Sequence, residues 1–262
     1  MGPGLPAAEA PVRWKLWPVA ALALLAGRDI AAQPAGSSVV DHNLNTWWSY
    51  AGDHPIAGGW SAISEAEIRR TTFVATAHQI VFREAAAYRF SPHAQVAVGY
   101  IWTRNARYGD FPAEHAFLEH RAFQQLSLRH TRMHLDFDHR FRIEQRWFQD
   151  FSHGEAYFWR YQNRARYQFR FTLPISRANE RGRQWHLFAG DEIMFHFGPN
   201  HGAHALNQNR VQAGIGYHLT RNNRVEIGYL NQYLLQQNGF VNESNHTLRF
   251  QFTSTARLFG KR

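Results

Sequence analysis

Residues 132–173 alternate charged or polar side chains with apolar ones over two long runs. In the first run the even positions are almost all charged, and the odd positions are largely aromatic or aliphatic. Successive side chains of a β-strand point to opposite faces, so this period of two predicts strands with one charged and one apolar face. The runs are roughly three times as long as a typical strand of about five or six residues. Strands of this kind are typical of a barrel whose outer surface meets lipid.

The basic residues are nearly all arginine, because lysine occurs only at Lys15 and Lys261. The formal net charge of +9 and the isoelectric point near 10.2 raise the question of nucleic-acid binding. The arginines, however, are interleaved with Glu and Asp at alternate positions instead of forming a run. Guanidinium groups pair bidentately with carboxylates, so this pattern favours ion-pair ladders across strands and argues against a nucleic-acid partner. Because cysteine is absent, neither disulfides nor a cysteine metal site can hold the fold.

The N-terminus has the features of an export signal. Two basic residues precede an apolar run at 16–27, and the small residues Ala31 and Ala32 follow it. The run is well short of the roughly 20 residues that a membrane-spanning helix needs. We therefore predict a signal peptide over residues 1–32 and one outer-membrane β-barrel domain over residues 33–262.

Strand-like segments separated by turn signals fill the rest of the chain. They are residues 42–50, 60–70, 79–90, 95–104, 118–130, 132–148, 157–173, 185–197, 206–219, 224–236 and 245–259. Compact connections alternate with mostly longer ones, as periplasmic turns and extracellular loops do in outer-membrane barrels. Only a closed barrel satisfies every backbone group of membrane strands, and bacterial single-chain barrels have an even number of strands. The sequence therefore predicts an all-β fold, a transmembrane antiparallel up-and-down β-barrel of about 10–12 strands, with twelve preferred to ten.

Aromatic residues gather toward the ends of the expected strands, as in the girdles at the two membrane interfaces. They are Trp47, Trp48, Trp60, Tyr100, Trp102, Trp147, Trp159, Trp185 and Phe259. The rival architecture is a soluble barrel or sandwich, in which the apolar face would point inward. The export signal, the aromatic residues and the alternating connections favour the membrane form. We therefore expect the apolar face to meet lipid and the charged face to line the lumen.

Several motifs give the chain a resemblance to a known family. They are Trp47-Trp48, Glu119-His120-Arg121 with Gln124-Gln125, the heptad at 140–146, Arg164-Ala165-Arg166-Tyr167, Asp191-Glu192, Asn207-Gln208-Asn209-Arg210 and Gly228-Tyr229. On these residues the chain resembles the outer-membrane β-barrel family of domain of unknown function 2490, over roughly residues 45–259. The resemblance implies a barrel in the bacterial outer membrane and no established activity. The partners expected for such a barrel are outer-membrane lipid and, during biogenesis, the barrel-assembly machinery.

The charged face carries both signs, so it can form an ion-pair network inside the barrel. The candidate lumen residues are Glu119, Arg121, Gln125, Arg140, Arg142, Glu144, Arg146, Arg164, Arg166, Glu192, Arg210 and Glu226. A barrel of about 10–12 strands lies between eight-stranded barrels that side chains fill and larger ones that hold an aqueous channel. The network is therefore expected to brace the barrel and either plug its lumen or narrow it to a pore. A channel for small anions stays open as the alternative, because arginine rings favour anions.

A membrane lipid hydrolase would require a serine beside a histidine that a third polar residue orients. The sequence contains no His-x-Ser motif. Ser152-His153 falls in a predicted loop, and Ser244-Asn245-His246 is placed at a loop edge, with neighbouring residues of a strand pointing to opposite faces. We therefore predict no catalytic residues and expect that the protein is not an enzyme.

Sixteen histidines raise the question of a metal site. Zinc would need three or four convergent ligands, and two groups could meet near the extracellular rim. These groups are His115 with His120, and His196 with His201 and His204. Their spacing is irregular and no partner stands at a characteristic offset, so we predict neither a metal nor another cofactor.

Overall fold

The computed structural model describes residues 39–258, except 114, 152–153, 155, 201–202 and 237–238. The predicted signal peptide over residues 1–32 lies outside the described residues, as does Phe259. Within the described ranges, no helix is long and apolar enough to cross a membrane.

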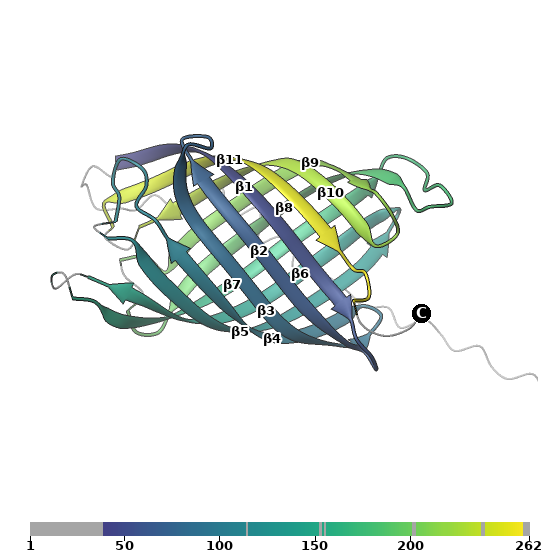
Figure 1. The fold of residues 1–262 in the computed structure, drawn as a ribbon, viewed down its shortest axis with the longest axis horizontal. Coiled ribbons are helices and arrows are strands. Elements are labelled where there is room, and N and C mark those ends of the chain that lie inside the picture. The colour runs from purple at the N-terminus through teal and green to yellow at the C-terminus, as the bar shows by residue number, and fades with distance from the viewer. Residues whose placement is uncertain are drawn as a thin grey trace, which may run out of the picture. The chain divides into compact units, whose positions relative to one another are not determined.

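In the described part of the chain, eleven strands close into a barrel in which strands adjacent in sequence are also paired in space (Figure 1). They are β1 (Val39–Pro55), β2 (Trp60–Thr71), β3 (Thr76–Ser91), β4 (Ala94–Asn105), β5 (Phe117–Arg132), β6 (Leu135–Asp150), β7 (Phe158–Pro174), β8 (Gln184–Phe197), β9 (Leu206–His218), β10 (Asn223–Leu235) and β11 (Val241–Ser254). Each corresponds to one predicted segment, so the predicted all-β barrel is confirmed.

The closure between β1 and β11 differs from what the sequence predicted. These two strands pair in parallel, from Val39 opposite Val241 to Gly52 opposite Ser254. An odd number of strands leaves the first and last running in the same direction, so they can close the barrel only in parallel. The expectation of an even number is wrong for the described part of the chain, because all eleven segments, including the first, are strands of the closed barrel. All other neighbouring strands are antiparallel.

The connections between strands lie at two rims of the barrel, and they are mostly longer at one rim than at the other. We call the end at which β11 finishes the short-turn rim; its connections are residues 56–59, 92–93, 133–134, 175–183 and 219–222. The opposite end is the loop rim, with connections 72–75, 106–116, 151–157, 198–205 and 236–240. The turn between β5 and β6 contains only Met133 and His134, whose φ angles are 49° and 68°. Positive φ at both central residues is the geometry that matches the twist of two antiparallel strands.

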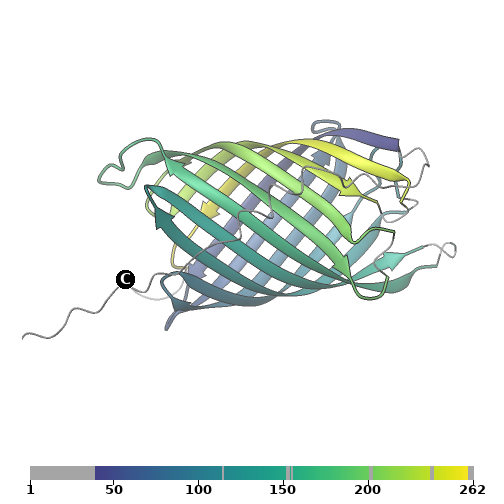
Figure 2. The ribbon, with the colours of Figure 1, turned by 180° about the vertical axis from the view of Figure 1, so that it is seen from behind.

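The barrel places its charged face inside and its apolar face outside. Glu144 and Gln162 are fully buried, whereas Val98 is 60% exposed and Phe82 is 51% exposed. A soluble barrel would have the reverse arrangement, so the apolar exterior supports the membrane form over its rival. The strands run obliquely to the barrel axis when seen from both sides, as closure of a sheet requires (Figure 2).

Two parts of the wall depart from the simple pattern. Trp47 was expected in an aromatic girdle, but it points inward and is only 2% exposed, while Trp48 faces outward. Neighbouring residues of one strand cannot share a face, so only one of the two can meet lipid. Inside, the apolar side chains Val81, Ile101 and Phe123 form a small buried cluster on β3, β4 and β5.

Candidate functional site

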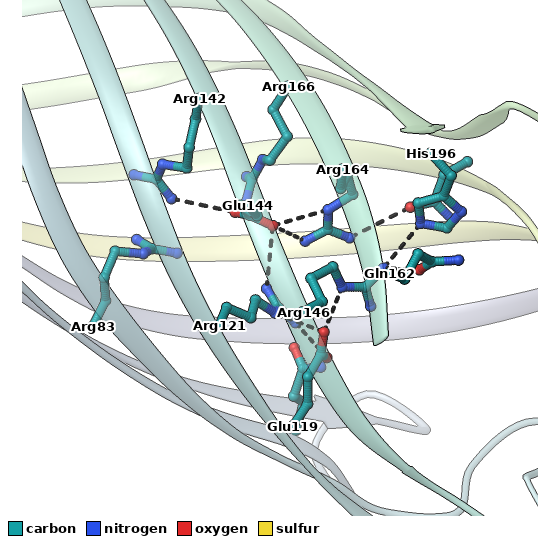
Figure 3. A network of polar contacts seen from close by, with 12 residues as sticks. Arg83, Glu119, Arg121, Arg142, Glu144, Arg146, Gln162, Arg164, Arg166 and His196 are labelled. Carbon is teal, nitrogen blue, oxygen red and sulfur yellow. Dashed lines mark hydrogen bonds and ion pairs between the residues drawn. The ribbon is translucent and has the colours of Figure 1, made fainter. Parts of the chain in front are cut away.

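Glu144 on β6 is the centre of the ion-pair network (Figure 3). Its Oε2 accepts hydrogen bonds from Nε and Nη2 of Arg164 at 2.9 and 2.6 Å, and its Oε1 accepts one from Nη1 of Arg166 at 2.7 Å. Arg121 and Arg142 approach the same carboxylate at 4.0 and 3.8 Å. The pairing of β6 with β7 sets Arg164 directly opposite Glu144, which explains the contact.

Glu119 on β5 forms a second centre of the network (Figure 3). It stands near the start of β5 and is therefore closer to the loop rim. It accepts two hydrogen bonds from Arg121, two residues along the same strand, at 2.8 and 2.6 Å. Arg146 on β6 donates to the same carboxylate through Nε, and through Nη1 it contacts Gln162 at 2.8 Å and His196 at 2.9 Å. These contacts join four neighbouring strands, β5, β6, β7 and β8, on the inside of the barrel.

Glu192 on β8 is the third centre. It binds Arg166 at 2.7 Å, Arg140 at 2.8 Å and Arg210 at 3.5 Å. Arg166 therefore bridges Glu144 and Glu192. Buried carboxylates of this kind are tolerable only when charged partners satisfy them, and each of these has at least two.

Gln125 is part of the network through Arg142. The Nε of Arg142 donates to Oε1 of Gln125 at 2.9 Å, and the guanidinium carbon lies 4.4 Å from the centre of the Phe123 ring. Eleven of the twelve predicted lumen residues thus form one connected set, through Glu119, Glu144 and Glu192.

Glu226 stands apart from that set. It pairs with Arg170 at 2.7 Å, and with His186 and Arg224 at 3.1 Å each, none of which the sequence analysis had selected. Further lumen charges outside the predicted set are Glu65 paired with Arg83, Glu67 paired with Arg69, and Arg249, which donates to the neutral amide of Gln212. The same period of two in residues 60–70 and 79–90 was a signal that could have identified the first four of these residues.

The network separates two cavities. The larger, of about 700 Å³, extends toward the loop rim, and its lining includes seven arginines and two glutamates. The smaller, of about 140 Å³, extends toward the short-turn rim, and its lining includes four arginines and two glutamates. Val81 and Arg83 line both cavities, so they mark the boundary.

The connection between β4 and β5 folds over the mouth of the larger cavity. Tyr108 donates a hydrogen bond of 2.7 Å to Glu243, and its ring centre lies 3.8 Å from that of His78. The backbone N–H of Asp110 donates to Asp41 at 3.2 Å. Gly109 between them has a φ of 76°, and a Cβ there would lie 2.6 Å from a carboxylate oxygen of Asp41, so a larger residue would be strained. Burial, and then the charge of Glu243, raise the pKa of Tyr108 well above its ordinary value.

Ser244 and His246 do not lie at a loop edge as predicted. Both belong to β11 and, being two residues apart, share its outward face. Asn231 donates to the Ser244 hydroxyl at 3.4 Å, and His246 Nδ1 pairs with the Tyr229 hydroxyl at 2.6 Å. Among the described contacts, none joins Ser244 to His246. Ser152 and His153 lie outside the described residues, so the absence of catalysis stays a prediction.

The candidate histidines lie at different places. His120 pairs with the Tyr100 hydroxyl on the outer face, whereas His196 points into the lumen and contacts Arg146. His115 packs against Phe151 in the loop region, and His201 is not among the described residues. No group of three His, Asp or Glu residues able to hold a metal occurs in the described ranges. The absence of a metal therefore also stays a prediction.

A closed β-barrel with an apolar exterior and an ion-paired interior has the architecture of a transmembrane barrel. The profile of the family described as "Protein of unknown function (DUF2490)" matches residues 44–245, and the chain belongs to this family. Among solved structures, the beta domain of the Bordetella autotransporter Brka is similar, with 10% identity and a TM-score of 0.41 over 68% of this chain and 78% of that one. No curated protein matches.

Proposed function

We propose that this protein is a bacterial outer-membrane barrel whose lumen forms a narrow passage for small anions. The observation that carries the proposal is the excess of arginine over glutamate around both cavities. Three of the four glutamates that line the cavities, Glu65, Glu67 and Glu119, are already paired with arginine, and the fourth, Glu243, is hydrogen-bonded to Tyr108, Gln236 and Asn245. The arginines that line the cavities therefore outnumber the carboxylates that could neutralise them. A mobile anion in the lumen would neutralise the surplus positive charge, as it does in pores lined by arginine.

The same network supports a bracing role, which is compatible with a pore. Glu119, Glu144 and Glu192 link five strands, from β5 to β9. If one partner of a buried ion pair is removed, the other charge stays buried without a counter-charge, which is strongly destabilising. Loss of one member of the network would therefore destabilise the barrel. A fully closed barrel with a purely structural network is therefore the second candidate function, and it predicts no conductance.

Arg83 is the residue at which a passage would open. Its guanidinium pairs with Glu65, and its side chain lines both cavities. An arginine at the boundary between the two cavities would attract anions and repel cations, so selectivity would follow from position as well as from total charge.

Single-channel recording in a planar lipid bilayer tests the proposal. Folded protein under a potassium chloride gradient is expected to give small conductance steps with a reversal potential displaced toward that of chloride. Arg181→Gln is the matched control, because it removes one exposed arginine on the short-turn rim and leaves the lumen intact. Folded protein without conductance steps would favour the purely structural function, and cation selectivity would contradict the anion passage.

The location is tested separately by cell fractionation. The protein is expected in the outer-membrane fraction, with a gel mobility that changes on boiling because a folded barrel resists detergent. Recovery in the soluble periplasm without a mobility shift would contradict the membrane location.

A further inference from the structure

Trp47 has an unusual position for a tryptophan of a membrane barrel. Its indole is buried inside the lumen, and two guanidinium groups lie over its ring system. The guanidinium carbon of Arg69 is 3.9 Å from the ring centre, and that of Arg210 is 5.1 Å from it. Tryptophan is the aromatic side chain that holds cations best. Trp47 thus fixes two positive charges side by side on the wall of the larger cavity.

Carboxylates neutralise these two arginines only in part. Arg69 uses its Nε to bind Glu67, and within the described contacts its two Nη groups have no protein partner. Arg210 lies 3.5 Å from Glu192, which is already bound by Arg140 and Arg166 at shorter distances. The pair therefore retains positive charge, and Arg69 retains open N–H donors at both of its Nη groups.

The surroundings of the pair are polar and include few carboxylates. In the orientation that satisfies its amide, Gln208 accepts a hydrogen bond of 2.9 Å from Nε of Arg210, which fixes that guanidinium in place. Gln232 and His78 also line the cavity. Both carboxylates of the lining are engaged elsewhere: Glu119 binds Arg121 and Arg146, and Glu243 accepts from Tyr108, Gln236 and Asn245.

The size of the space suits a solute and not only an ion. The cavity holds about 700 Å³, within the range of roughly 300–1,000 Å³ common for ligand pockets. Part of its roof is the connection between β4 and β5, from Tyr108 to Ala113, at the loop rim. A solute would therefore enter from that rim and meet the network before any passage onward.

We propose that this cavity is a binding site for a solute carrying a phosphate or carboxylate group, with Arg69 and Arg210 as its anion ligands. Guanidinium groups bind both kinds of oxyanion bidentately. Trp47 is the positioning residue, because its ring holds the guanidinium groups of Arg69 and Arg210 in place before the ligand binds. In the proposed anion passage, this cavity is the place where the anion binds first. Binding in the cavity does not depend on the passage, and only the onward movement of the anion rests on the proposed function.

Isothermal titration calorimetry of the full-length folded protein in detergent tests the site. The probes are inorganic pyrophosphate and citrate, in separate arms that distinguish phosphate from carboxylate recognition. Saturable binding of at least one is expected. Arg69→Gln and Arg210→Gln should each weaken it roughly tenfold, because each removes charged hydrogen bonds. Arg69→Lys keeps the charge but loses the bidentate fork, so it should recover only part of the affinity.

Arg181→Gln should bind as the unmodified protein does, and unchanged gel mobility on boiling shows that each variant is folded. Absence of saturable binding, or equal binding by the folded Arg69→Gln and Arg210→Gln variants, would overturn the site. Binding without conductance would overturn the passage but keep the site, and conductance without binding would do the reverse.

Discussion

Glu144 accepts a 2.7 Å hydrogen bond from Nη1 of Arg166, and Glu144 has no solvent exposure at all. Arg166 also reaches Glu192 at 2.7 Å, so a single guanidinium joins two of the three carboxylate centres of the lumen. The network is continuous because of this bridge.

Glu144→Gln is therefore expected to destabilise the barrel. It leaves Arg164 and Arg166 facing an amide where a buried carboxylate stood, and breaking a buried pair typically costs about 3–5 kcal/mol. The temperature at which the folded band disappears from unboiled gels measures the effect. Glu180→Gln, on the exposed connection between β7 and β8, is the control of equal charge change. Equal melting of the two variants would show that the network does not brace the fold.

Arg83→Ala is expected to join the two cavities. Arg83 lines both of them, and truncation removes its long side chain from the boundary. Single-channel conductance should rise by about twofold or more, since a narrow lumen is limited by its constriction. Arg257→Ala, at the short-turn rim, where the side chain donates to the Ile56 carbonyl, provides the control. Unchanged conductance in Arg83→Ala would place the constriction elsewhere.

Tyr108→Phe is expected to loosen the connection that covers the larger cavity. The change removes the 2.7 Å hydrogen bond to Glu243 but keeps the ring against His78. Because the pKa of Tyr108 is raised in the folded protein, its stabilising contribution is complete below the ordinary tyrosine value of about 10. The contribution is lost as pH rises through the raised pKa, when a phenolate would face the carboxylate.

Two measurements check this prediction. Protease cleavage between residues 106 and 113 at neutral pH should be faster in Tyr108→Phe than in the unmodified protein. In an alkaline titration followed by tyrosinate absorbance, the unmodified protein should show one late-titrating group that the variant lacks. Identical titration curves would mean that Tyr108 is not held against Glu243.

Glu84→Leu is expected to stabilise the barrel in lipid. Glu84 points outward from the middle of β3, and its carboxylate accepts a hydrogen bond of 2.6 Å from Ser64 on β2. A lipid-facing carboxylate is unfavourable, though less so than the about 2–4 kcal/mol of a basic residue at the midplane. The leucine variant should gain about 1 kcal/mol in urea titrations of protein folded into vesicles.

Ser64→Ala provides the matched test of that pair. Alone, it leaves the Glu84 carboxylate without its serine partner and should lower stability. Combined with Glu84→Leu, it should have almost no further effect, because there is no carboxylate left to satisfy. A loss of stability in Glu84→Leu itself would indicate that this part of the outer wall contacts protein instead of lipid.

The sequence by itself determined the strands, the single barrel and the sets of residues that share a face. The period of two in residues 132–173 places Arg140, Arg142, Glu144 and Arg146 together on one side, because successive side chains of a strand alternate. The same rule failed to say which of Trp47 and Trp48 faces lipid, since it fixes alternation but not the direction of the first side chain.

Only the tertiary structure decided the pairing inside the lumen and the closure of the barrel. Glu226 meets Arg170 and His186, which are 56 and 40 residues away in sequence. Contacts across a lumen depend on the stagger of all strands, which no local pattern contains. The parallel pairing of β1 with β11, and the two cavities that the network separates, follow from that same closure.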